Sequence, residues 1–170
     1  LIPAFAELVK HQPHLHLALL GLAPERYHGG DQQAELRALL CDANDLQQRL
    51  LLPGVSGTMA SWYERATVFV LPSRYEGFPN VLLEAMAAGC ACIASDCLTG
   101  PADLIDHEEN GLLLSPQAST KQWVEAIESL LLDPDRRRAM GERATAVRDR
   151  YAPERLRRDC LEALRRLRHG

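Results

Sequence analysis

The sequence predicts an α/β fold, in which helices cover both faces of a parallel sheet. Three short apolar runs, at residues 17–20, 68–71 and 93–95, have the unbroken hydrophobic character of strands that are buried on both faces. Segments with helical spacing of apolar residues lie between these runs, and strands that alternate with helices build parallel sheets. The length of 170 residues is enough for one domain with a sizeable core.

The amino-terminal segment predicts a helix over residues 1–10 and a strand over residues 15–20. A turn follows at Gly21-Leu22-Ala23-Pro24-Glu25, and the next helix is expected from Gln32 to about Cys41. Three histidines stand at the first helix-to-strand connection: His11, His14 and His16. We favour a structural interpretation over a metal site here, because no cysteine or carboxylate lies near them in the sequence.

The middle of the chain contains the predicted sheet. A strand over residues 49–53 is followed by a short helix, Met59 to Ala66, which contains Trp62 and Tyr63. Aromatic side chains can stack on a base, but we favour packing of this pair against the next strand. After the run at 68–71 we expect the following elements: a helix over 80–88, a strand over 91–95, a short helix over 101–105 and a strand over 112–114.

From Ser119 onward the sequence is almost entirely helical. Residues 121–132 are amphipathic, with Trp123, Ile127 and Leu130 or Leu131 expected to face inward. A second helix is expected to reach Tyr151, and a third to begin at Pro153 with an apolar stripe that includes Leu156, Cys160, Leu161, Leu164 and Leu167. We therefore divide the chain into a domain of residues 1–151 and a carboxyl-terminal helix of residues 152–170.

Charge and cysteine content limit the class of protein. Twelve of the seventeen arginines lie between Arg136 and Arg168, interleaved with acidic residues, which is typical of a solvated helix face with ion pairs. An anionic membrane surface or a nucleic acid is the less favoured partner for this face. The net charge is −4, and no run of 18 apolar residues or secretory signal is visible. The five cysteines form no C-x-x-C pair, so we expect a cytoplasmic protein without a structural disulfide.

Two carboxylates stand on either side of the turn that follows the run at 68–71. Glu76 lies in the predicted loop, and Glu84 lies about one turn into the predicted helix that starts near Pro79. A strand, a polar loop and a helix form the unit in which open α/β sheets bind ligands, and a helix start offers unpaired N–H groups to an anion. On spacing alone, a structural interpretation is as good as a functional one. In the structural interpretation Glu76 is a solvated loop acid, and Glu84 is a first-turn acid that complements the helix dipole.

The stretch from Glu76 to Gly89, E-G-F-P-N-V-L-L-E-A-M-A-A-G, resembles the signature of retaining glycosyltransferases of family 4, also called group 1. That family carries two glutamates separated by seven residues, and Glu76 and Glu84 match both. The resemblance extends from about Leu1 to Tyr151. It implies a Rossmann-like domain, the carboxyl-terminal half of a GT-B fold, and a first strand that would precede Leu1.

The resemblance also implies roles for individual residues. Glu76 is expected to be the catalytic residue, which holds hydroxyls of the donor sugar close to the transferred carbon. Glu84 is expected to accept hydrogen bonds from the ribose. The other residues expected to bind the donor, a nucleotide-diphosphate sugar, are Gly77, Phe78, Pro79, Asn80 and Val81. The diphosphate would rest on the N–H groups of Asn80 and Val81, and no metal or other cofactor would be required.

The implied activity is retaining transfer from a UDP-sugar to a glycan or lipid-linked acceptor, in polysaccharide or glycoconjugate synthesis. UDP is preferred because the F-P-N-V and T-G-P segments look most like those of UDP-sugar users. An amino-terminal GT-B domain would supply most of the acceptor site, so the 170 residues by themselves are expected to be inactive. Two other classes stay open: a nucleotide-sugar binding module or epimerase of the same fold, and an interaction protein that acts through the arginine-rich helices, including peripheral contact with the inner face of a membrane.

Overall fold

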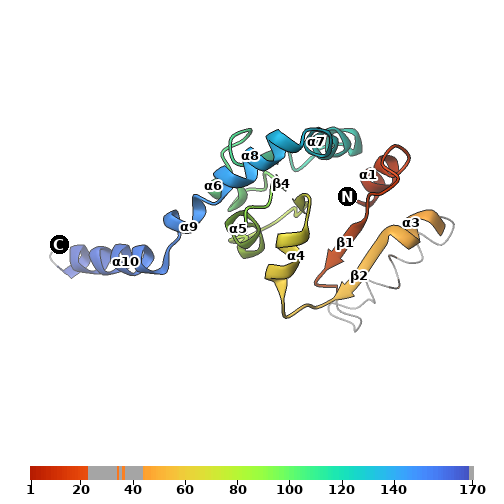
Figure 1. Ribbon diagram of the computed structural model, residues 1–170. Helices are drawn as coiled ribbons and strands as arrows, with labels where there is room; N and C mark the ends of the chain where they lie inside the picture. The colour runs from red at the N-terminus through yellow and green to blue at the C-terminus, as the bar shows by residue number, and fades with distance from the viewer. Residues whose placement is uncertain (23–33, 35, 37–43, 169–170) are drawn as a thin grey trace. The chain divides into compact units, whose positions relative to one another are not determined.

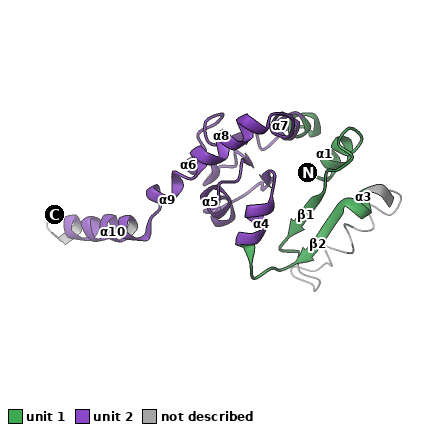
Figure 2. Cartoon of the chain, in the orientation of Figure 1, with its two compact units in different colours: residues 1–59, 119–124 green, residues 60–118, 125–170 purple. Residues whose placement is uncertain are grey.

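The computed structural model describes residues 1–22, 34, 36 and 44–168 of the chain (Figure 1). These residues belong to two compact units, which are coloured separately in Figure 2. Unit 1 comprises residues 1–59 and 119–124, and unit 2 comprises residues 60–118 and 125–170. The helix predicted from Gln32 to Cys41 and residues 23–25 of the first turn lie outside the described residues, apart from positions 34 and 36.

Unit 1 contains a parallel pair of strands, as predicted. β1 (Leu17–Leu20) pairs with β2 (Leu50–Gly54), with Leu17 opposite Leu50. The helix α1 (Ile2–Leu8) precedes β1, and α3 (Asn44–Arg49) leads directly into β2. Ala4, Phe5 and Leu8 give α1 its buried side.

Unit 2 is built on a three-stranded parallel sheet in the order β3-β4-β5. These strands are β3 (Phe69–Leu71), β4 (Cys92–Ser95) and β5 (Leu112–Leu114), and Ile93 of β4 pairs with a residue of each neighbour. Every residue of β4 is buried. The unbroken apolar run at 68–71 predicts a strand in the interior of the sheet, whereas β3 flanks β4 in this three-stranded sheet and has half-buried side chains at its first two positions. The mostly small side chains of β4 suit the central position, since close neighbours surround it on both edges.

The helices α4 (Met59–Arg65), α5 (Asn80–Ala87) and α6 (Pro101–Leu104) connect or precede these strands, close to their predicted positions. α5 contacts both β3 and β4, and its side chains Leu82, Ala85 and Met86 are completely buried. Their spacing of three and one residues places them on one side of the helix. Gly89 follows the end of the helix, and its φ of +84° is the left-handed conformation that favours glycine at that position.

Four helices follow β5: α7 (Thr120–Leu132), α8 (Pro134–Ala144), α9 (Val147–Arg150) and α10 (Pro153–Arg168). Trp123, Ile127 and Leu130 of α7 are buried, as their spacing predicted. The single helix predicted as far as Tyr151 is wrong, because a turn at Thr145 divides it into α8 and α9. The Thr145 hydroxyl donates to the Glu142 carbonyl at 2.7 Å, and the Thr145 amide donates to the same oxygen at 3.2 Å. These bonds tighten the last turn of α8, which sequence periodicity does not reveal.

The backbone of α8 approaches the turn after α5 so closely that only glycine fits. An ideal Cβ built on Gly141 would lie far inside the van der Waals contact distance to the Gly89 carbonyl oxygen, and 3.4 Å from the Ala91 nitrogen. Gly141 is buried, and its neighbours in this contact are backbone atoms that have no side-chain freedom to move aside. The contact joins α8 to the segment that enters β4.

We expect Gly141→Ala to lower the free energy of unfolding by about 1–3 kcal/mol, because the added methyl forces two backbone segments apart. Chemical denaturation measures this change. The matched control is Gly57→Ala, since a Cβ at Gly57 meets nothing within 4 Å, and its effect should stay within about 0.5 kcal/mol. Equal stability of the two variants would show that the α8 contact is not tight.

The described side chains of α10 are all exposed. Leu161 is 45% exposed and Leu164 is 61% exposed, although their spacing gives the helix an apolar stripe. Ion pairs join neighbours on its polar side, such as Arg166 to Glu162 at 2.7 Å. Exposed ion pairs of this kind contribute little to stability, so α10 has little tertiary support among the described contacts.

We expect the amides of residues 157–166 to exchange with solvent much faster than those of α5 and α7, because an isolated helix of sixteen residues is marginal in water. Hydrogen exchange measured at several protein concentrations tests this expectation. Strong protection at every concentration would contradict it, because the helix would then have a stable partner within the chain.

Candidate functional site

The loops that follow β3 and β4 lie at the same edge of the sheet. The two strands are parallel, so residues 72–79 and residues 96–100 both leave the carboxyl edge. This edge is where open α/β sheets bind ligands. Two of the three loops expected to form a site are therefore neighbours in unit 2. The third loop belongs to unit 1, where the Gly21 amide donates to the Gly54 carbonyl at 2.9 Å.

The two loops of unit 2 are joined by direct contacts. The Thr99 hydroxyl donates a hydrogen bond to the backbone carbonyl of Glu76. Gly100 has a φ of +97°, and a Cβ there would lie 2.5 Å from Cδ of the buried Pro79 and 3.3 Å from the Gly77 carbonyl oxygen. A residue with a side chain would be strained at this φ and would collide with Pro79. Gly100 thus allows the loop of residues 72–79, which contains Glu76, to pack closely against the loop after β4.

The start of α5 differs from the expected anion site in one respect. The Asn80 amide donates to the Phe78 carbonyl at 3.0 Å, so it is not free as predicted. Pro79 is the N-cap residue, and its carbonyl accepts from the amides of Leu82 and Leu83. Within the described part of the chain, no group accepts a hydrogen bond from the Val81 amide. Val81 is therefore the residue whose N–H remains available at this helix start.

Phe78 anchors the same loop to the end of α9. Its ring packs against that of Tyr151, with centroids 5.6 Å apart and planes at 56°. The Tyr151 hydroxyl in turn donates to the Asp103 carbonyl at 3.2 Å. Phe78 is still 41% exposed, so one part of the ring holds the loop in place and the rest faces solvent. This contact joins the candidate site to residues about seventy positions later in the sequence.

The two glutamates have different surroundings. Glu76 is half-buried in the loop, whereas Glu84 is exposed on α5. The hydroxyl of Tyr63, on α4, donates to Oε2 of Glu84 at 3.0 Å. Burial, followed by the hydrogen bond to Glu84, raises the pKa of Tyr63, so the hydroxyl keeps its proton. Core packing was predicted for Tyr63 and is confirmed, but its bond to Glu84 was missed, because twenty-one residues separate the two in sequence.

The histidines and cysteines of the described residues are candidates for metal ligands and disulfide partners in the sequence, and their contacts are structural. Among the residues that the structure describes, no group of three or more His, Cys, Asp and Glu side chains is placed to hold a metal ion. His16 Nδ1 instead lies 3.0 Å from the His14 carbonyl oxygen. Cys90, Cys92, Cys97 and Cys160 are free thiols. No helix in the described ranges has both the length and the apolar character needed to cross a lipid bilayer.

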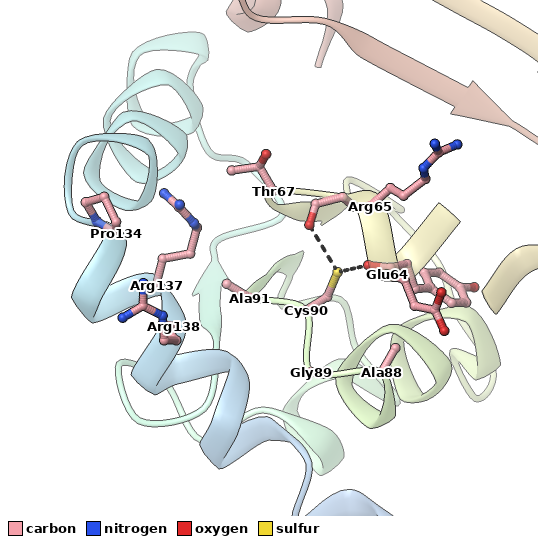
Figure 3. A pocket seen from close by; sticks show the side chains of 12 residues that line it. Glu64, Arg65, Thr67, Ala88, Gly89, Cys90, Ala91, Pro134, Arg137 and Arg138 are labelled. Carbon is pink, nitrogen blue, oxygen red and sulfur yellow. Dashed lines mark hydrogen bonds between the residues drawn. The ribbon is translucent and has the colours of Figure 1, made fainter. Parts of the chain in front are cut away.

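A cavity of about 440 Å³ lies at the opposite, amino edge of the unit 2 sheet (Figure 3). It is lined by residues that directly precede β3 and β4, and by three residues of α8. Arg65 points away from Arg137 and Arg138 in Figure 3, so the three guanidinium groups do not converge. Arg137 donates to the Leu130 carbonyl at 2.7 Å, and Arg138 pairs with Asp135 at 3.3 Å. Arg137 and Arg138 therefore have structural partners, and the glutamate motif lies elsewhere.

Comparisons with known proteins agree with the motif. Residues 1–147 match the family described as Glycosyl transferases group 1. An exopolysaccharide phosphotransferase of Streptomyces coelicolor is 37% identical over 154 residues, which are 90% of this chain and 15% of that protein. A D-inositol 3-phosphate glycosyltransferase of Pseudarthrobacter chlorophenolicus is 35% identical over 149 residues, covering 87% of this chain and 34% of that protein.

Solved structures share the fold. The Anabaena protein HepE, solved in complex with UDP, superposes with a TM-score of 0.84 at 21% identity, covering 95% of this chain and 44% of that chain. The 170 residues thus span less than half the length of each of these proteins. The fold is that of a GT-B glycosyltransferase, and the match extends over nearly the whole of the described sequence. The chain belongs to the group 1 glycosyltransferase family.

Proposed function

We propose that this chain is the donor-binding part of a retaining glycosyltransferase that uses a nucleotide-diphosphate sugar. The observation that carries the proposal is the clamped pair of loops at the carboxyl edge of β3 and β4, which presents Glu76 beside the start of α5 in a member of the group 1 family. Such an edge binds nucleotides in open α/β sheets. The alternative of a binding module or epimerase is not favoured, because the family consists of transferases.

In this proposal each residue of the motif binds a different part of the donor. Glu76 holds hydroxyls of the sugar near the transferred carbon, and Glu84 accepts hydrogen bonds from the ribose hydroxyls. The diphosphate lies at the start of α5, where the Val81 amide is available and the positive end of the helix dipole favours an anion. Gly77 leaves room for close approach, since nothing lies within 4 Å of a Cβ built on it. Asn80 would contribute its side chain, because its amide is already bonded.

The reaction follows from the donor. A bond forms between an acceptor hydroxyl oxygen and the anomeric carbon, and the bond from that carbon to the diphosphate oxygen breaks. We propose a front-face reaction in which the leaving phosphate takes the proton of the acceptor hydroxyl. The protein then acts by orienting the donor and stabilising the leaving diphosphate, which is largely electrostatic work and does not require a metal.

We also propose that an amino-terminal GT-B domain supplies most of the acceptor site. The chain covers 34% of the glycosyltransferase and 15% of the phosphotransferase to which it is similar, so most of each of those proteins lies outside the match. We favour a glycan or a lipid-linked molecule as the acceptor, and the cytoplasm as the location of the enzyme. The name of the Streptomyces protein does not favour phosphotransfer here, since the match covers a small part of that protein.

The arginine-rich helices support a structural role over a nucleic-acid or membrane contact. Eight of their arginines have acceptors within the chain, for example Arg143 with the Glu109 carbonyl and Arg148 with the Ala87 carbonyl. The others with such acceptors are Arg136, Arg137, Arg138, Arg155, Arg158 and Arg166. Side chains engaged in this way have fewer donors to offer to phosphate groups.

A nucleotide titration followed by amide NMR tests the site. We expect UDP to shift the amides of residues 76–78, 80–81 and 96–100 more than it shifts the rest of the chain, and more strongly than GDP does. UDP is the preferred nucleotide from the F-P-N-V and T-G-P segments, and HepE was solved with UDP. Shifts that map to the cavity at the amino edge of the sheet would overturn the location. Larger shifts with GDP would overturn the choice of nucleotide.

The two glutamates should fail differently when each is replaced by glutamine in the full-length transferase. Glu84→Gln should mainly weaken UDP binding, because a charge-assisted hydrogen bond contributes about 1.5–3 kcal/mol. Glu76→Gln should lower turnover and leave UDP affinity nearly unchanged, because its partner is the sugar. Calorimetry with UDP and steady-state kinetics with the donor separate the two effects. Equal losses of UDP affinity in both variants would contradict this division of roles.

Gly100→Ala should weaken UDP binding and lower the free energy of unfolding by about 1–3 kcal/mol. The added methyl group must displace Pro79, and alanine is unfavourable at the positive φ of this position. The same NMR titration and a denaturation curve measure the two effects. Gly57→Ala again serves as the control, since its Cβ would meet open space. Unchanged UDP shifts in Gly100→Ala would mean that the clamp does not position the nucleotide site.

A further inference from the structure

The carboxylate of Glu84 has one hydrogen-bond donor among the described residues, and that donor is fixed in the core. Oε2 of Glu84 accepts from the Tyr63 hydroxyl at 3.0 Å, while no described group donates to Oε1. Tyr63 is only 5% exposed, whereas Glu84 lies on the exposed side of α5. The bond therefore connects a solvent-facing carboxylate to a buried side chain on another helix.

Two further contacts hold Tyr63 in place. Its ring packs edge-to-face on Phe69 of β3, with centroids 5.7 Å apart and planes at 76°. The Cys90 thiol donates to the Tyr63 backbone carbonyl at 2.9 Å, which ties α4 to the segment before β4. A buried aromatic ring in such a packed environment has little rotamer freedom. Its hydroxyl is therefore a donor at a defined point beside α5.

A free glutamate on a helix surface samples several rotamers, and ordering such a side chain on binding reduces affinity. A donor that already holds one carboxylate oxygen lowers this cost. It also leaves the second oxygen to accept a hydrogen bond from a ligand. The same hydroxyl cannot become a competing acceptor by losing its proton near neutral pH, because burial and the adjacent Glu84 raise its pKa.

We propose that Tyr63 is a positioning residue for nucleotide binding. It holds Oε2 of Glu84 so that Oε1 is presented to the ribose hydroxyls of the donor. This inference rests on the proposed role of Glu84 and adds to it the residue that makes the carboxylate ready before the nucleotide arrives. Tyr63 does not touch the nucleotide itself, so its effect on binding passes entirely through Glu84.

Tyr63→Phe tests the proposal, because it keeps the ring that packs on Phe69 and removes only the hydroxyl. We expect the affinity of the 170-residue chain for UDP, measured by NMR titration, to fall about 3- to 10-fold, the size expected for one hydrogen bond. Its affinity for 2′,3′-dideoxy-UDP should stay within about twofold of the unmodified chain, since that ligand lacks the hydroxyls that Glu84 would bind. Equal losses for both nucleotides, or no loss for either, would overturn the proposal.

Ser129→Ala is the matched control, because it also removes a hydroxyl, which there donates to the Ala126 carbonyl at 2.8 Å within α7 and not to Glu84. Its UDP affinity should differ from that of the unmodified chain by less than about twofold. A thermal unfolding curve for each variant shows whether it is folded. A loss of UDP affinity in Ser129→Ala as large as that in Tyr63→Phe would overturn the proposal.

Glu84→Gln and the double variant Tyr63→Phe/Glu84→Gln complete a thermodynamic cycle. If Tyr63 acts through Glu84, the double variant should bind UDP no more than about twofold more weakly than Glu84→Gln alone. Additive losses would overturn the positioning role. If Tyr63→Phe keeps normal UDP affinity while Glu84→Gln binds UDP more weakly, the positioning role is overturned and the role of Glu84 stays intact. Normal UDP affinity in Glu84→Gln would overturn the ribose assignment, and the positioning role with it.

Discussion

The burial of β4 between two parallel neighbours is the constraint on which the rest of unit 2 depends. Parallel pairing of β4 with β3 and β5 brings the carboxyl ends of the three strands to one edge. Only then do the loops at residues 72–79 and 96–100 become adjacent, so that Gly100 meets Pro79 and Thr99 reaches the Glu76 carbonyl. The buried side of α5, which carries Glu84 on its other side, also packs on this strand. The candidate site is thus a consequence of one sheet register.

Much of the fold was predictable because the signals for each element are local. Apolar runs located each strand of the described residues to within two positions, and Pro79, Pro101, Pro134 and Pro153 stood at or just before helix starts. The errors arose where nearby and distant contacts compete. Thr145 divides a helix by a side-chain bond to Glu142 that periodicity cannot register. β3 was expected in the interior of the sheet because an apolar run such as Phe69-Val70-Leu71 occurs both in central strands and in the strands that flank them.

The positions of the motif residues in the fold were predictable, and their contacts were less so. Glu76 and Glu84 were identified from the motif, and their loop and helix positions were correct. The engaged amide of Asn80, the packing of Phe78 on Tyr151 and the bond from Tyr63 to Glu84 were not. Each depends on atoms brought together by tertiary structure, and no spacing rule relates positions 63 and 84 or 78 and 151. A sequence motif thus places residues on loops and helices more readily than it identifies the distant side chains that contact them.

The junction between α7 and α8 has a consequence for the order of folding. Asp133 accepts from the Arg136 amide at the start of α8, and Arg137 donates to the Leu130 carbonyl at the end of α7. Both bonds close loops of fewer than ten residues, which costs little chain entropy. The pairing of β3 with β4 instead joins positions 69 and 92, about twenty residues apart. We therefore expect the junction between α7 and α8 to form early and reversibly, and the pairing of the strands to set the rate at which the chain folds.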